Sequence, residues 1–532
     1  MKRAFLLFTL LVCTLQLKAQ HQFDYAYGFG DQGQIFSHIV DDSDRNYLFM
    51  VKTNNSAPLY VDPINRSIVT TIETQSVHFF ITVLNPDGSY IRSIELEFEM
   101  DLYFPDMRIN SQGEIYVLSN FQEQAYLDPQ NPTVKTFDVP GETGVFVAKY
   151  DTNGQLLYAR KATHSQGTDM PYQINLALIN DDDFMLYSTL PEAMDMSFDG
   201  SSQSFGTNGT KQSFIGLYTN DGILQTGHNL GGHTVIDSFE PNSQGQVFMY
   251  GALSEGTIDL DKSAASQTLT FTDRARNYIA KFDTNLDYLG QIDYGQGNHA
   301  GPRLLKIDDS DSVIVSSTSA WESLFTDNTR DRLDLDPGTG VFDMVSETSR
   351  AIFVARYDQN FTFGGAHVIG GTSNNQIQID HVDFNDDQFL LQTSLLAHGI
   401  TGIQIEGGTI MPLVGKRDYA ISLSRGGKIL GSEHLDRMRN TRLASNNDIY
   451  YTGNAGTLTD LNSGSGTFYL TNLETGLKGA FIARMTQCQG DNTATTIQVC
   501  HSTPVQVGTN TYTEAGTYLD FLENMSGCDS LV

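Results

Sequence analysis

The chain has 532 residues, of which 63 are acidic and 32 are basic, giving a formal net charge of −31 at pH 7. So acidic a surface repels phosphate backbones, which argues against nucleic acid as a partner. With 48 glycines, 31 phenylalanines, 24 tyrosines and one tryptophan, the composition indicates many turns and a core built from Phe and Tyr.

The first nineteen residues have the pattern of a secretory signal. Lys2 and Arg3 precede the apolar stretch 4–17, and Ala19 is the small residue expected at a cleavage site. Cys13 follows Val12, which is not small, so a lipoprotein anchor is disfavoured. No other apolar run approaches the ~18 residues that a membrane helix needs. We therefore expect a secreted protein, extracellular or at the outer cell surface, without a transmembrane segment.

One segment recurs seven times in the body of the chain. Its clearest copy starts at Phe146 and reads Phe-Val-Ala-Lys-Tyr-Asp-Thr-Asn-Gly, a β-strand followed by a turn. The other copies are 62 to 75 residues apart and begin at Phe80, Phe214, Tyr278, Phe353, Tyr419 and Phe481. A period held over seven copies predicts a repeat architecture.

Each repeat can be divided into four strands, named A, B, C and D in chain order. In the fourth repeat these are residues 235–239, 247–251, 278–282 and 288–294, and a polar excursion separates strands B and C. No segment has the periodicity of an amphipathic helix, so we predict an all-β fold. Small residues in strand C are expected to let neighbouring repeats pack closely.

The two ends of the repeat region complement each other. Residues 23–27 resemble a strand D that has no repeat before it, whereas the seventh repeat lacks a strand D after Met485. Pairing these ends would remove exposed strand edges. We therefore predict that residues 20–486 form a seven-bladed β-propeller closed by its N-terminal strand, with a monomeric body.

The excursion and the strand after it resemble the SBBP-type β-propeller repeats of secreted Bacteroidota proteins. The closest copy combines Asp-Leu-Asp-Pro-Gly, starting at Asp334, with Phe-Val-Ala-Arg-Tyr-Asp, starting at Phe353. The resemblance covers nearly the whole body and implies a propeller fold. It implies no particular reaction, because that family has no single assigned activity.

Residues 487–532 differ from the body in being threonine-rich and in containing Cys488, Cys500 and Cys528. They resemble the cysteine-paired β modules near the C-terminus of Bacteroidota surface proteins, many of which use the type IX export route. The resemblance implies a disulfide between Cys500 and Cys528 and leaves Cys488 without a partner in the module. The pattern stops within a strand, so we expect this partial module to continue beyond Val532.

The acidic excursions allow two interpretations. Asp259 with Asp261, and Asp334 with Asp336, have the spacing that places two carboxylates on one side of a strand, where they could bind calcium. The alternative is a turn in which Asp accepts backbone N–H groups. We favour the turn, and we predict no obligatory cofactor, because only two excursions carry paired acids.

Residues that break the repeat are the candidates for ligand binding. They lie in the D-to-A connections, which crowd around one mouth of a propeller's channel. The sequence lacks the motifs of serine hydrolases, zinc proteases and phosphate loops, so no catalytic residue is predicted. The candidates are Asp101, His164, Asp169, His233, His299, Arg303, Asn374 and Arg437.

These observations predict an exported, non-enzymatic propeller that serves as a binding or adhesion scaffold for protein or glycan. One alternative is a propeller enzyme acting on polysaccharide, either a hydrolase or a lyase. A second alternative is a structural spacer within a larger adhesin.

Overall fold

A computed structural model describes most of the chain. It covers residues 21–531 except 32, 53–57, 67–68, 71–76, 99–104, 132, 165–172, 181–182, 202, 208–209, 254–255, 272–275, 297, 300–303, 321–332, 345–349, 372–376, 386–387, 396–401, 406–408, 413–417, 425–428, 435–437, 457–460, 462–467, 471–477, 488–503, 508–509, 514–520 and 524–528. The predicted signal segment and all three cysteines of the C-terminal region lie outside the described residues.

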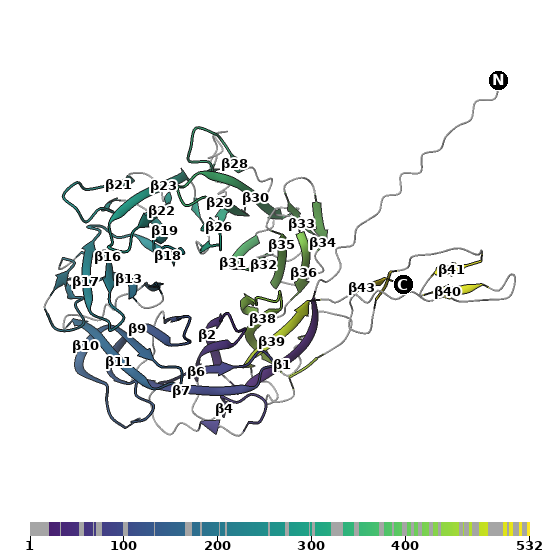
Figure 1. The fold of residues 1–532 in the computed structure, drawn as a ribbon, viewed down its shortest axis with the longest axis horizontal. Coiled ribbons are helices and arrows are strands. Elements are labelled where there is room, and N and C mark those ends of the chain that lie inside the picture. The colour runs from purple at the N-terminus through teal and green to yellow at the C-terminus, as the bar shows by residue number, and fades with distance from the viewer. Residues whose placement is uncertain are drawn as a thin grey trace.

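The described residues form an all-β structure in which antiparallel sheets are arranged around a central axis (Figure 1). Seven four-stranded units can be traced in them, each with the predicted order A-B-C-D. The units are β2 (Gly33–Val40), β3 (Asn46–Lys52), β6 (Val77–Leu84) and β7 (Tyr90–Phe98); β8 (Asp106–Ile109), β9 (Ile115–Tyr126), β10 (Phe137–Tyr150) and β11 (Leu156–His164); β12 (Ile174–Ile179), β13 (Asp183–Leu190), β16 (Gln212–Tyr218) and β17 (Leu224–Asn229); β18 (Val235–Pro241), β19 (Val247–Leu253), β22 (Arg276–Phe282) and β23 (Tyr288–Gln296); β25 (Leu304–Ile307), β26 (Val313–Ala320), β29 (Arg350–Tyr357) and β30 (Phe363–Gly371); β31 (Ile377–Phe384), β32 (Gln388–Leu395), β35 (Asp418–Ser424) and β36 (Ile429–His434); and β37 (Met438–Leu443), β38 (Ile449–Gly456), β39 (Lys478–Gln487) and β1 (His21–Asp31).

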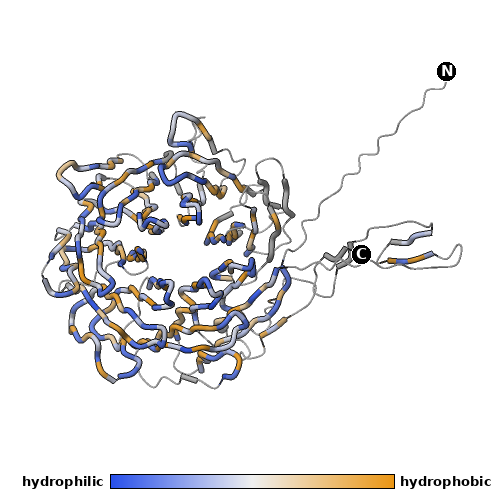
Figure 2. The backbone as a smooth tube through the Cα atoms, viewed as in Figure 1, coloured by the Kyte–Doolittle hydropathy of each residue, from blue (hydrophilic) through white to orange (hydrophobic). Residues whose placement is uncertain are grey.

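The core lies between neighbouring units, where apolar side chains of the B and C strands interleave. Figure 2 shows these apolar residues distributed along the strands of the ring. The small residues of strand C have the predicted role, since Ala148, Ala280, Ala355 and Ala483 are fully buried. At Gly216 an added Cβ would lie 2.6 Å from the ring of Phe214, so only glycine fits there.

The excursions between strands B and C contain short hairpins, and a buried tyrosine fixes several of them. Tyr150 and Tyr357, at the ends of their C strands, donate hydrogen bonds of 2.8 and 2.7 Å to the carbonyls of Leu127 and Leu335. In the last unit, strand C has Met485 at this position, which cannot donate. Tyr451 of strand B donates there instead, to the carbonyl of Leu461 in the excursion of the same unit. The hairpins are β4 (Leu59–Tyr60) with β5 (Val69–Thr70), β14 (Met194–Asp195) with β15 (Ser204–Phe205), β20 (Gly256–Asp259) with β21 (Thr268–Phe271), β27 (Leu333–Asp334) with β28 (Asp343–Met344), and β33 (Gly402–Ile405) with β34 (Thr409–Pro412).

The basic residue that recurs in strand C also has a structural explanation. Lys149 lies over the ring of Tyr116, with Nζ 4.9 Å from its centroid, and forms an ion pair of 2.8 Å with Glu114. Arg484 lies in the same way over Tyr450 and pairs with Asp448. In these two units the basic residue therefore ties strand C to the A–B turn of its own unit, whereas the equivalent Lys281 donates to the Gln359 carbonyl of the next unit.

The first and last strands of the ring pair as the strand count predicts. β1 runs antiparallel to β39, with Phe23 opposite Met485 and Gly28 opposite Phe481. The innermost strands also contact one another in sequence. The contacts run from β2 to β8, β12, β18, β25, β31 and β37, and from β37 back to β2.

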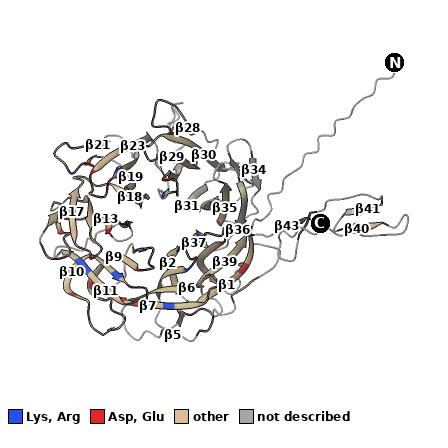
Figure 3. Ribbon diagram, in the orientation of Figure 1, with Lys and Arg blue, Asp and Glu red and all other residues tan. Residues whose placement is uncertain are grey.

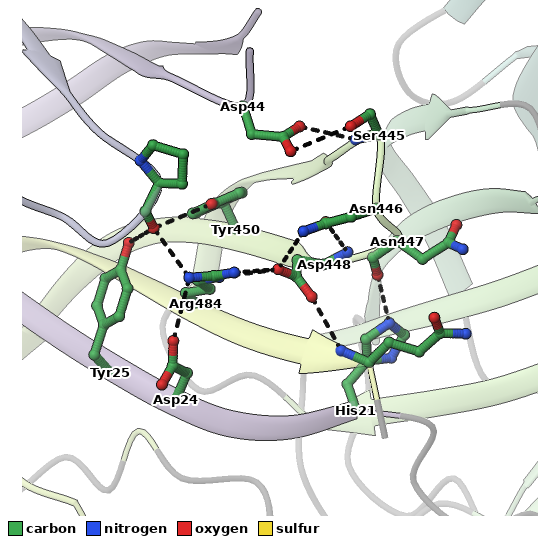
Figure 4. A network of polar contacts seen from close by, with 12 residues as sticks. His21, Asp24, Tyr25, Asp44, Ser445, Asn446, Asn447, Asp448, Tyr450 and Arg484 are labelled. Carbon is green, nitrogen blue, oxygen red and sulfur yellow. Dashed lines mark hydrogen bonds and ion pairs between the residues drawn. The ribbon is translucent and has the colours of Figure 1, made fainter. Parts of the chain in front are cut away.

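Polar contacts reinforce the junction between the last unit and the first, here called the seam (Figure 4). The Pro86 carbonyl, in a turn of the first unit, accepts hydrogen bonds from Tyr25, Tyr450 and Arg484 of the last unit. Ser445 donates both its N–H and its hydroxyl to Asp44 of the first unit. Burial raises the pKa of the Tyr25 hydroxyl well above its ordinary value, so it stays protonated and can donate.

After β39 the described residues form two separate hairpins. They pair β40 (Val505–Val507) with β41 (Asn510–Tyr512), and β42 (Phe521–Glu523) with β43 (Asp529–Leu531). The described part of the chain contains no helix long and apolar enough to span a bilayer.

Candidate functional site

The structure describes few of the predicted ligand-binding residues. Of the eight, only His233 has a described side chain; it precedes β18 and is partly exposed, and burial lowers its pKa. His164 ends β11, and His299 lies in β24 (Asn298–His299), but their side chains are not among those described. Asp101, Asp169, Arg303, Asn374 and Arg437 lie outside the described residues.

The paired aspartates of the excursions form turns, as the favoured interpretation predicts. Asp259 accepts the N–H groups of Asp261 and Gln267 through one carboxylate oxygen, at 3.1 and 2.9 Å. Asp334 accepts the N–H groups of Asp336 and Phe342, at 3.0 and 2.8 Å. No group of three or more His, Cys, Asp or Glu side chains is placed to hold a metal ion within the described segments.

Charged residues occupy one equivalent position on the innermost strands, which the loop-based prediction missed. The position lies near the end of strand A, two residues before the residue whose N–H closes the A–B turn; in the second unit, for example, Asn110 closes the turn and Arg108 occupies the position. It is charged in five of the seven units. An alignment of the seven A strands would reveal this signal, since a charge recurs at the position in five of them. Ile39 and Leu178 occupy the position in the other two units. The five are Arg108 on β8, Glu240 on β18, Lys306 on β25, Asp383 on β31 and Arg442 on β37.

These five residues, together with Asp106 and His381, are here called the axial cluster. Arg108 pairs with Asp106 at 2.6 Å on the same strand, and Lys306 reaches Glu240 on the neighbouring unit at 3.0 Å. Arg442 Nη1 contacts His381 Nε2 on the neighbouring β31. Figure 3 shows charged residues on the outer strands and again near the centre of the ring.

Electrostatic coupling between distant units shows that these side chains converge on the axis. Burial alone would raise the pKa of Glu240, but the charges of Lys306, Arg108 and Arg442 hold it below its ordinary value. β8 and β37 are not neighbours of β18 in the ring. These charges act on one carboxylate because the innermost strands that carry them surround a common axis.

The cluster is enclosed by protein but still reaches solvent. The side chains of Glu240 and Lys306 keep 21% and 33% of their surface exposed. Burial, with Arg442 next in importance, lowers the pKa of His381 well below its ordinary value, so this imidazole is neutral near pH 7. A neutral His381 accepts a hydrogen bond from Arg442 at Nε2 and therefore has its own proton on Nδ1. The cluster thus offers charged groups and a neutral hydrogen-bond donor.

Comparisons with known proteins assign neither a family nor an activity to the chain. No protein-family model matches the chain, and no curated protein is similar to it. A protein of unknown function from Dyadobacter fermentans is 11% identical, over 73% of this chain and 95% of that chain, with a TM-score of 0.31. The polysaccharide lyase Uly1 is 8% identical, over 88% and 99%, with a TM-score of 0.38. The rhamnogalacturonan lyase PL11 of Bacillus licheniformis is 9% identical, over 77% and 91%, with a TM-score of 0.25.

This chain is thus a large all-β protein with a distant structural likeness to proteins of unknown function and to polysaccharide lyases. A likeness this distant carries no argument about its own activity. The resemblance to the SBBP repeats remains a prediction from the repeated motif.

Proposed function

We propose that the chain is a seven-bladed β-propeller completed by β1, and that it acts as an exported, non-enzymatic scaffold binding a protein or glycan at the outer cell surface. The observation that supports this most directly is the axial cluster. Its charged side chains come from five units, and the contacts of Lys306 with Glu240 and of Arg442 with His381 join neighbouring units, which favours a rigid ring.

A rigid ring suits a scaffold because it positions loops without requiring them to fold on their own. The excursions are fixed by buried tyrosines and by aspartates that accept backbone N–H groups. These acidic groups therefore serve the frame, and recognition is left to the connections between units and to the axis. The net charge of −31 favours solubility outside the cell.

The test is a binding screen of the full chain against immobilised glycans and against proteins of the cell surface, with product analysis of every bound glycan. We expect saturable binding and recovery of the glycan intact. Shortened or unsaturated products would favour a polysaccharide-active enzyme over a scaffold. If the chain bound neither glycans nor proteins, the result would favour a structural spacer over a scaffold.

A further inference from the structure

Arg442 differs from the other cations of the axial cluster in its partners. Its Nη1 donates to the Thr441 carbonyl at 2.8 Å and contacts His381, and both of these groups are neutral. Among the described residues no carboxylate lies within ion-pair distance of its guanidinium, although Arg108 and Lys306 each have one. Arg442 is therefore a cation at the axis without a bonded anion.

The carboxylates of the cluster are already engaged. Glu240 pairs with Lys306, and Asp383 accepts the N–H of Leu443 at 2.9 Å. Asp106 accepts both Arg108 and the N–H of Leu176, the latter at 2.8 Å. Reorienting any of them toward Arg442 would break a charge-assisted hydrogen bond, so an anion for this guanidinium would have to come from outside.

Two further features favour an anionic ligand. The charge of Arg108 acts against that of Arg442 across the axis, while Asp383 and Glu240 act in its favour, and a negative ligand group beside both arginines would offset the repulsion further. Among the described residues, the hydrogen-bond partners of Arg442 contact only Nη1, which leaves its other N–H groups available to a ligand. A planar guanidinium with free donor positions matches the oxygen pair of a carboxylate or phosphate.

We propose that the axial cluster is an oxyanion-binding site in which Arg442, assisted by the charge of Arg108, binds a carboxylate or phosphate group of a ligand. This inference rests on the proposed function and deepens it by naming the ligand's chemistry. The oxyanion has two possible sources, the carboxylate of an acidic sugar chain and free phosphate.

The experiment is calorimetric titration of the full chain with three probes: inorganic phosphate, an oligogalacturonate and a neutral galacto-oligosaccharide. Arg442→Gln removes the cation, and Arg442→Lys keeps the charge but loses the planar pair of donors. Arg160→Gln is the matched control, because Arg160 lies on the outer strand β11 and donates there to the Asp221 carbonyl. Thermal melts of each variant establish that it is folded.

We expect the parent chain to bind at least one oxyanion probe and the neutral sugar more weakly. Arg442→Gln should weaken that binding by about tenfold or more, with a smaller loss in Arg442→Lys and no change in Arg160→Gln. Binding of phosphate would identify a free oxyanion as sufficient, and binding of oligogalacturonate alone would identify an acidic glycan. Equal binding by folded Arg442→Gln and Arg160→Gln, or equal affinity for the neutral sugar, would overturn the inference. The proposed scaffold function would survive that result if the screen had found a ligand.

Discussion

Aspartate side chains form polar contacts both in the excursions and at the seam, but their partners lie at very different distances along the sequence in the two regions. In the excursions, Asp259 and Asp334 accept N–H groups from residues two to eight positions away. At the seam, Asp44 accepts the N–H of Ser445, 401 residues away. An excursion can therefore form early and independently, whereas the seam exists only when the whole ring has assembled. Damage to the seam should affect the whole body, and damage to an excursion should stay local.

Removing β1 should have the largest effect. Deletion of residues 21–31 leaves the edge of β39 unpaired and takes Tyr25 away from the seam. We expect aggregation or a loss of several kcal/mol of stability, because an exposed strand edge pairs with other chains. Size-exclusion chromatography and thermal melts would show this. Deleting residues 522–532, an equal length at the other end, should leave the main transition in place. Equal melting of the β1 deletion and the parent would contradict the role given to β1.

A single substitution at the seam should be the next most damaging. Arg484→Met leaves the Asp448 carboxylate, whose side chain is only 6% exposed, without its cation. We expect a loss of about 3 kcal/mol in denaturant unfolding, since a charge left unpaired in a buried site is costly. Lys135→Met is the control, because its ion pair with Asp138 is largely exposed and should contribute less than about 1 kcal/mol. Adding Asp448→Asn to Arg484→Met should recover part of the loss, and no recovery would argue against this explanation.

The anchoring tyrosines test an excursion by itself. Tyr357→Phe removes the hydroxyl that donates to the buried Leu335 carbonyl, and we expect a loss of about 1–2 kcal/mol in denaturant unfolding. Tyr451→Phe should cost a similar amount although it lies on a different strand of its unit. Tyr126→Phe, whose hydroxyl contact with Gln124 is long at 3.5 Å, should cost almost nothing. A cost in Tyr126→Phe as large as in Tyr357→Phe would show that the excursion carbonyl is not the cause.

Acid should weaken a local turn in a predictable direction. Burial tends to raise the pKa of Asp308, but Ser310, the Ser312 N–H and Arg356 together hold it below its ordinary value. Its stabilising contribution is therefore complete above pH ~4 and is lost as pH falls through the folded-state pKa. Asp308→Asn should cost about 1 kcal/mol at pH 7, and this difference should shrink below pH 4 in unfolding curves measured at several pH values. A difference that grew in acid would contradict the direction of the shift.

Calcium should have the smallest effect. The carboxylates of Asp259 and Asp334 accept backbone N–H groups, so their turns do not require a cation. We expect the melting temperature to change by less than about 2 °C between calcium and a chelator. A rise of more than roughly 10 °C with calcium would restore the metal-site interpretation.

Sequence reasoning succeeded where a feature repeats or is local. The strands, the pairing of β1 with β39 and the aspartate turns follow from periodicity, strand counting and turn chemistry. The axial cluster was missed because strand A shows only that a position is charged. That Arg108, Glu240 and Arg442 meet at one place depends on how the ring closes, which no local pattern encodes. Seven of the predicted loop residues have no described side chain, so their role stays a prediction.

The pairing of β1 with β39 also fixes the order of events while the protein is being made. Among the described strands β1 leaves the ribosome first, but its partner β39 comes more than four hundred residues later. At about 5–20 residues per second, translation of the intervening chain takes on the order of 20–90 s. During that interval a strand rich in Phe and Tyr has, among the described strands, only its one-residue pairing with β4. We therefore expect nascent chains of this protein to need protection of β1 from pairing with another polypeptide until β39 has been made.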